Sequence, residues 1–138
     1  MISTLYERTE GITTLMLEFD DERSGGFEVL RGAPPDKLLV LGLVSTKAAR
    51  LESPGEITSR IEEAARYLPL GQLAVSTQCG FSPTVDGAVM DESEQWRKLA
   101  LVAEIAASVW KELYISLRSQ RASLATSTIC LFNVHPSL

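Results

Sequence analysis

The chain has 138 residues, which is enough for one domain with a substantial apolar core. Hydrophobic residues make up 45% and charged residues 22% of it, which is ordinary for a folded protein and argues against disorder. The formal net charge of −5 argues against nucleic acid as a partner, because a nucleic-acid-binding protein needs a basic face.

The cysteine content and the apolar runs bear on the compartment. Two cysteines, Cys79 and Cys130, do not make a disulfide framework. No basic-then-apolar leader opens the chain, and no apolar run reaches the roughly 18 residues that a membrane span needs. We therefore expect a protein of the reducing cytoplasm that does not act at a membrane.

Three apolar stretches are typical of strands. Residues 12–19 (ITTLMLEF) are rich in aliphatic and β-branched residues. Residues 38–44 (LLVLGLV) have no polar alternation, which indicates a strand covered on both faces, as in a parallel sheet flanked by helices. Gly42 within this stretch indicates the close approach of another backbone. A third strand begins at Leu73 and is followed by Cys79.

Helix-start signals mark two longer helices. Ser53 at the N-cap, Pro54 at the first position and Glu56 two residues later form a capping box, and this helix should end at Pro69. Asp91 should cap a second long helix. Its predicted apolar stripe consists of Trp96, Leu99, Val102, Ala106, Val109 and Trp110, and both tryptophans are expected in the core.

The order of these elements brings polar side chains together. Each strand is followed by helix or helix-like sequence, and such βα units make neighbouring parallel strands whose carboxyl ends share one edge of the sheet. Glu18, residues 45–47 (STK) and Cys79 each lie at such an end. A carboxylate and a thiolate on one rim form half of a zinc site, because zinc accepts both kinds of ligand.

Other roles for these side chains remain open at this point. Glu18 could form a salt bridge with Arg23 or Lys47, and Cys79 could be a free thiol packed as a small apolar residue. Lys47 could bind an anionic group of a substrate or pair with an acid such as Asp20 or Asp21. We favour the ion pair for Lys47, and exposed pairs contribute only about 0–1 kcal/mol.

Three motifs resemble a known family. Residues 17–28 (LEFDDERSGGFE), 41–47 (LGLVSTK) and 78–81 (QCGF) closely resemble the carboxyl-terminal catalytic domain of cobalamin-independent methionine synthase, especially its short bacterial and archaeal-type relatives. The resemblance covers about residues 12–110. It implies a (β/α)₈ TIM barrel that transfers a methyl group from a methyl-folate to homocysteine, whose sulfur is held by zinc. By motif match, Glu18 and Cys79 would be two of the zinc ligands.

The sequence departs from the family pattern in several ways. A barrel of this kind needs about 250 residues, and the motifs match only its last three strand units. The family's His-x-Cys ligand motif is absent, and we do not expect His135, the one histidine, to replace it. Relatives usually have proline in place of Thr77. We therefore expect α/β structure of about three parallel strands with flanking helices, forming the carboxyl-terminal part of an incomplete barrel.

The domain and function hypotheses follow from these departures. Residues 1–110 should be a partial barrel domain, and residues 111–138 a divergent tail that extends the last helix and then becomes irregular. The chain should be a fragment of a zinc-dependent methyltransferase of methionine biosynthesis, inactive alone and with weak or no zinc. One alternative is a non-catalytic module that associates through its open sheet edge, and another is a related alkyl transferase acting on a thiol such as coenzyme M.

Overall fold

The computed structural model describes residues 6, 9–82, 89–111 and 115. Its strands are β1 (Thr14–Glu18), β2 (Leu38–Val44) and β3 (Leu73–Thr77), and its α-helices are α2 (Pro54–Ala64) and α3 (Glu92–Val109). Short 3₁₀ turns are η1 (Glu22–Ser24), η2 (Phe27–Leu30) and η3 (Leu70–Gln72). Of the divergent tail that the sequence predicts, only residues 111 and 115 are described, and Cys130 and His135 lie outside the described residues.

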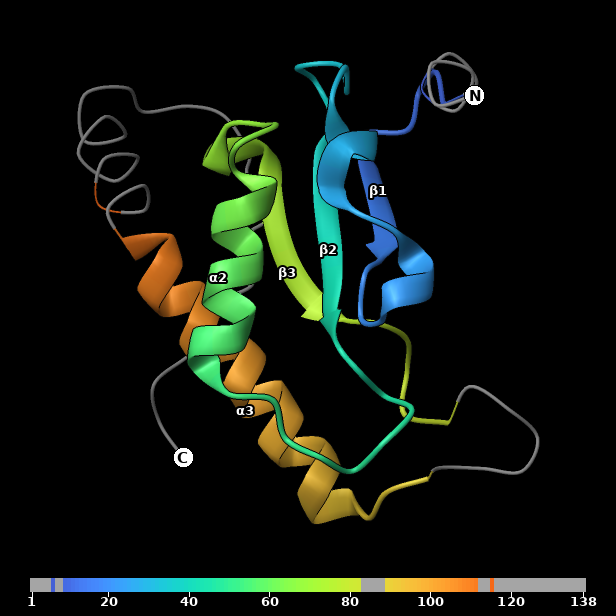
Figure 1. Ribbon diagram of the computed structural model, residues 1–138, viewed down its shortest axis with the longest axis vertical. Coiled ribbons are helices and arrows are strands. Elements are labelled where there is room, and N and C mark those ends of the chain that lie inside the picture. The colour runs from blue at the N-terminus through green and yellow to red at the C-terminus, as the bar shows by residue number, and fades with distance from the viewer. Residues whose placement is uncertain (1–5, 7–8, 83–88, 112–114, 116–138) are drawn as a thin grey trace.

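The three strands form one parallel sheet in the order β1-β2-β3. Glu18 pairs with Gly42, and Gly42 pairs with Ser76, so the strand ends are nearly level. In Figure 1 both helices lie next to β3, and β1 lies on the other side of β2. This confirms the predicted α/β fold with three parallel strands and flanking helices.

The helices cover only one face of the sheet. On that face Leu39 and Leu41 of β2 are fully buried and pack with Ile61 of α2 and Ile105 of α3. Along each strand, the side chains that point to the opposite face alternate with the buried ones. There Met16 is 71% and Leu38 37% exposed. The prediction that residues 38–44 are covered on both faces is therefore only partly right.

Gly42 is the point of close backbone approach that the sequence predicts. A Cβ atom at this position would lie 3.0 Å from Gln78 Cα, 3.1 Å from Leu17 O and 3.3 Å from Thr77 O. All three neighbours are backbone atoms, which cannot move aside as a flexible side chain can. The missing side chain therefore lets the chain leaving β3 pass close to β2.

Both predicted helix starts are confirmed. Ser53 Oγ accepts a hydrogen bond from Glu56 N at 3.2 Å, and Glu56 Oε2 accepts one from Ser53 N at 2.8 Å. Asp91 and Glu94 make the same reciprocal pair of bonds at the start of α3. These capping boxes satisfy backbone N–H groups that the first helical turn leaves free.

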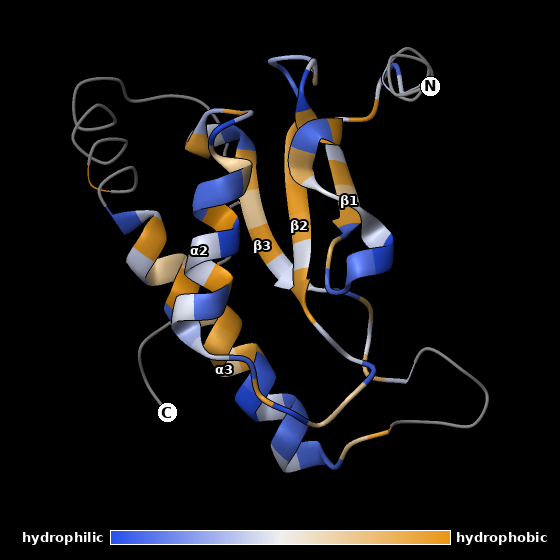
Figure 2. Cartoon of the chain, viewed as in Figure 1, coloured by the Kyte–Doolittle hydropathy of each residue, from blue (hydrophilic) through white to orange (hydrophobic). Residues whose placement is uncertain are grey.

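The predicted buried face of α3 is right for its second half, where Val102, Val109 and Trp110 pack against the core, and wrong for Trp96 and Leu99. Trp96 is 63% and Leu99 41% exposed, whereas Lys98, Leu101 and Ile105 are buried. Trp110 is half-buried and donates its indole N–H to Leu70 O at 2.9 Å. Apolar residues occur on both sides of this helix, and Figure 2 shows that its amino-terminal end is hydrophilic while its middle is largely apolar. Over the described ranges, no helix is long and apolar enough to cross a bilayer.

Candidate functional site

The turn after β1 carries two of the acids of the site. Phe19 is buried and its ring lies 4.8 Å from that of Phe27. Arg60 of α2 donates to Phe19 O at 3.1 Å and lies over the Phe27 ring at 5.0 Å. These contacts anchor the chain directly before Asp20 and Asp21, so both carboxylates turn back toward the strand ends.

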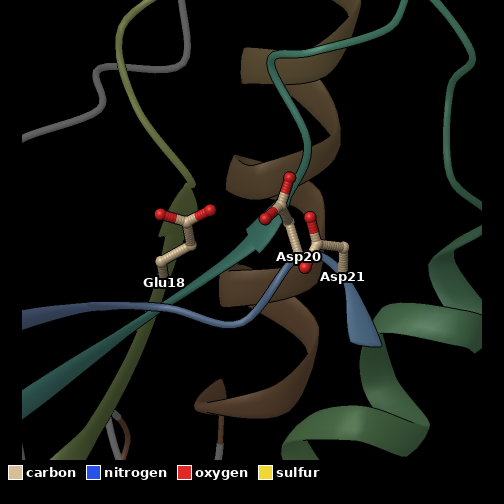
Figure 3. A group of neighbouring side chains, drawn as sticks. All are labelled: Glu18, Asp20 and Asp21. Atoms are coloured by element: carbon tan, nitrogen blue, oxygen red, sulfur yellow. The ribbon is translucent and has the colours of Figure 1, made fainter. Parts of the chain in front are cut away.

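Three carboxylates converge on Lys47, which follows the end of β2. Lys47 Nζ lies 2.7 Å from Glu18 Oε1, 3.0 Å from Asp20 Oδ1 and 3.1 Å from Asp21 Oδ2. Figure 3 shows the Glu18, Asp20 and Asp21 carboxylates close to one another. Arg23 also binds Asp21, at 2.7 Å. The ion pair favoured for Lys47 is therefore confirmed, and it includes Glu18 as well as both aspartates.

The charges in this cluster stabilise one another. Hydrogen bonding from Lys47 holds the pKa of Glu18 below its usual 4.5, and the nearby Gln78 side chain lowers that pKa further. Arg23 and then Lys47 hold the pKa of Asp21 far below its usual range. The three carboxylates in turn raise the pKa of Lys47 well above its ordinary value. Glu18, Asp21 and Lys47 are therefore all charged at neutral pH.

Asp20 is the most enclosed member of the cluster. Its side chain is only 1% exposed, and its Oδ2 atom is buried without a hydrogen-bond partner in the described structure. Among the described residues, Glu18, Asp20 and Asp21 form a group whose ligand-type oxygen atoms all lie within 4.8 Å of one another, so they could hold a metal ion. The Lys47 ammonium lies at the same carboxylates and competes with any such ion.

Cys79 lies on the same rim but outside this cluster. Its thiol is free and exposed, and the Thr77 hydroxyl donates to Cys79 O at 2.9 Å, which fastens the turn after β3. β2 lies between β1 and β3, so Glu18 and Cys79 end strands that are not neighbours. Gln78, the residue before Cys79, nevertheless reaches Glu18 closely enough to affect its pKa.

Zinc is a chemical fit for part of this rim. It accepts a cysteine sulfur and a carboxylate oxygen, and a closed site has four ligands. Glu18 and Cys79 supply one donor of each kind. A site made of carboxylates alone would suit magnesium, calcium or manganese better than zinc. The described residues thus include one carboxylate and one free thiol of the kinds that zinc binds.

Sequence reasoning placed Thr46 at the strand end but did not predict its burial, and it missed Lys98 and Glu52. Thr46 is fully buried and donates to Gln78 Oε1 at 3.0 Å. Lys98 is fully buried on α3 and pairs with Glu52, which is 8% exposed. The spacing of Lys98 from Leu101 and Ile105 could have placed it on the buried face, but a lysine there is unexpected without knowledge of its distant partner.

A parallel sheet covered by helices, with charged side chains at the carboxyl ends of its strands, places this chain among α/β proteins whose sites lie at that edge. No family model matches the sequence. The uncharacterized proteins YxjG and YxjH of Bacillus subtilis are 54% and 47% identical over 98 residues, which cover 70% of this chain and 26% of each relative. The chain thus spans about a quarter of the length of these curated relatives.

Two solved structures share the fold. One is a candidate vitamin-B12-independent methionine synthase from Listeria monocytogenes, with 36% identity, a TM-score of 0.63, and coverage of 79% of this chain and 30% of that one. The other is a B12-independent methionine synthase from Shewanella sp. W3-18-1 in complex with selenomethionine, with 21% identity, a TM-score of 0.61, and coverage of 83% and 31%. The similarity to the Listeria structure supports the family resemblance of the sequence motifs, and that to the Shewanella structure shows the shared fold.

Proposed function

We propose that this chain forms the carboxyl-terminal βα units of a zinc-dependent methyltransferase of the B12-independent methionine synthase type. Glu18 and Cys79 would be two of its zinc ligands, a homocysteine-like thiol the acceptor, a methyl-folate the methyl donor and the cytoplasm its compartment. The observation that supports this is a carboxylate and a free thiol on one rim of a sheet that matches the Listeria structure at 36% identity.

The residues have separable tasks in this proposal. Zinc, when bound, holds the acceptor sulfur as a thiolate, which is the nucleophilic form of a thiol. Cys79 offers an exposed sulfur, and Lys47 keeps Glu18 ionised and therefore able to act as a ligand. Lys47 also competes with a metal for that carboxylate. Two protein ligands do not close a four-ligand shell, so zinc affinity of this chain should be weak.

Zinc affinity, measured by competition with a chromophoric chelator, tests the proposal. We expect weak, saturable binding by the wild-type chain, no binding by Cys79→Ser, and binding weakened about tenfold or more by Glu18→Gln. Glu22→Gln is the matched control, because it removes the same charge from the same turn without touching the Lys47 cluster. Absence of wild-type binding, or equal affinities for Glu18→Gln and Glu22→Gln, would contradict the proposal.

The uncovered sheet face favours a second candidate function, self-association as a non-catalytic module. Met16 is 71% exposed on the outer strand β1, whose free edge has no strand beside it in the described structure. Apolar, unpaired strands of this kind associate unless charges prevent it. Sedimentation velocity over a range of concentrations should show a dimer that Met16→Lys dissociates and that Leu51→Lys, at an exposed loop position, leaves intact. A wild-type chain that stays monomeric throughout contradicts this candidate.

A further inference from the structure

The buried ion pair between Lys98 and Glu52 has no part in the site described above. Lys98 Nζ lies 2.9 Å from Glu52 Oε2 and also donates to Arg50 O at 2.5 Å. A fully buried lysine is rare unless it is paired. Such a pair is generally no more stabilising than well-packed apolar residues of similar volume. Stability alone therefore does not account for placing two charges here.

The pair connects to the rim through three hydrogen bonds that are linked by the covalent structure of Ser45 and Lys47. The second carboxylate oxygen of Glu52, Oε1, accepts from Ser45 N at 2.9 Å. Ser45 Oγ accepts from Lys47 N at 3.2 Å, and Lys47 Nζ donates to Glu18 Oε1 at 2.7 Å. Each carboxylate oxygen of Glu52 thus has its own partner, one on α3 and one at the carboxyl end of β2.

The same loop also contacts the stretch that carries Cys79. Thr46 lies between Ser45 and Lys47, is fully buried, and donates to Gln78 Oε1 at 3.0 Å. Gln78 directly precedes Cys79. Residues 45–52 therefore contact the proposed ligand Glu18 directly and the residue before the proposed ligand Cys79. Glu52 is the buried group that joins this loop to α3.

We propose that Lys98 and Glu52 are positioning residues that hold the loop of residues 45–52 so that Lys47 meets Glu18. The ion pair fixes the Glu52 carboxylate, and the carboxylate fixes the backbone of Ser45. The contacts alone support the linkage between the ion pair and the loop. Its role in presenting a zinc ligand rests on the proposed function. Lys98 itself touches neither ligand, so its effect on them is indirect.

Two double variants separate positioning from simple stabilisation. Lys98→Met with Glu52→Met removes both charges and the acceptor for Ser45 N, whereas Lys98→Met with Glu52→Gln removes both charges but keeps an acceptor oxygen. We expect the first variant to fold. Its Ser45 and Lys47 amide protons should exchange about tenfold faster than in wild type, because a buried hydrogen bond is lost. The ¹³C resonance of its Glu18 carboxyl should shift at pH 7. The second keeps an acceptor for Ser45 N but loses the ion pair that fixes it, so we expect it to lie between the first variant and wild type in both readouts.

Ser45→Ala provides an independent check that does not disturb the buried pair. It removes the acceptor of Lys47 N and should speed exchange of that amide and move the Glu18 carboxyl resonance. Unchanged Glu18 resonances in this variant and in a folded Lys98→Met, Glu52→Met variant would overturn the proposal. Neither amide exchange nor the Glu18 carboxyl resonance requires a metal. If the variants change both but the wild-type chain does not bind zinc, the proposed function is refuted and the positioning role remains.

Discussion

Lys98→Met should lower the free energy of unfolding by about 3–5 kcal/mol, because it leaves the Glu52 carboxylate buried without its counter-charge. Lys98 is fully buried and Glu52 only 8% exposed, so solvent cannot easily take the place of the lost ammonium. A domain of this size has about 5–15 kcal/mol of stability in total, so the loss would be severe. Urea unfolding followed by circular dichroism measures it.

The corresponding controls separate loss of the pair from loss of a side chain. Lys111→Met removes an exposed lysine just beyond α3 and should change stability by less than about 0.5 kcal/mol. Lys98→Met combined with Glu52→Met should recover most of the lost stability, because no unpaired buried charge remains. A single variant as stable as wild type, or a double variant as unstable as the single one, would contradict this account of the pair.

Gly42→Val should destabilise the protein by about 1–3 kcal/mol or more, because overpacking at this point meets backbone that cannot yield. The new Cβ would lie 3.0 Å from Gln78 Cα and 3.1 Å from Leu17 O. We expect a lower urea midpoint and altered amide resonances at Gln78 and Cys79, since β3 must move away from β2.

Gly55→Ala is the matched control for this variant. Gly55 lies in the first turn of α2, and a Cβ there has nothing within 4 Å. Alanine at such a position should be neutral or stabilise by about 0.4–1 kcal/mol through the unfolded state. A Gly42→Val protein with wild-type stability would show that the backbone at this crossing is not closely packed.

Signals that depend on a few neighbouring residues predicted the fold well. The apolar run 38–44 is β2, and Ser53 with Glu56 marks the start of α2, because strand patterning and capping boxes are written in local sequence. The strand order also followed, since short βα connections make parallel neighbours. The family resemblance drew attention to Glu18 and Cys79, and their role in binding zinc stays a prediction.

Features that depend on distant partners could not be predicted in the same way. α3 carries apolar residues on two sides, so its sequence alone does not decide whether Trp96 or Ile105 faces the sheet. The contact of Lys98 with Glu52 spans 46 residues, and that of Lys47 with Glu18 spans 29. The enclosed position of Asp20 likewise depends on where Lys47 lies, and no local pattern specifies it.

The central claim is that the carboxylate of Glu18 and the sulfur of Cys79 bind the same zinc ion. X-ray absorption spectroscopy of the zinc-loaded chain tests this most directly. We predict one sulfur at about 2.3 Å and carboxylate oxygen at about 2.0–2.2 Å from zinc, with the sulfur shell lost in Cys79→Ser and the oxygen shell altered in Glu18→Gln. A spectrum with oxygen and nitrogen neighbours only, and no sulfur, would contradict it.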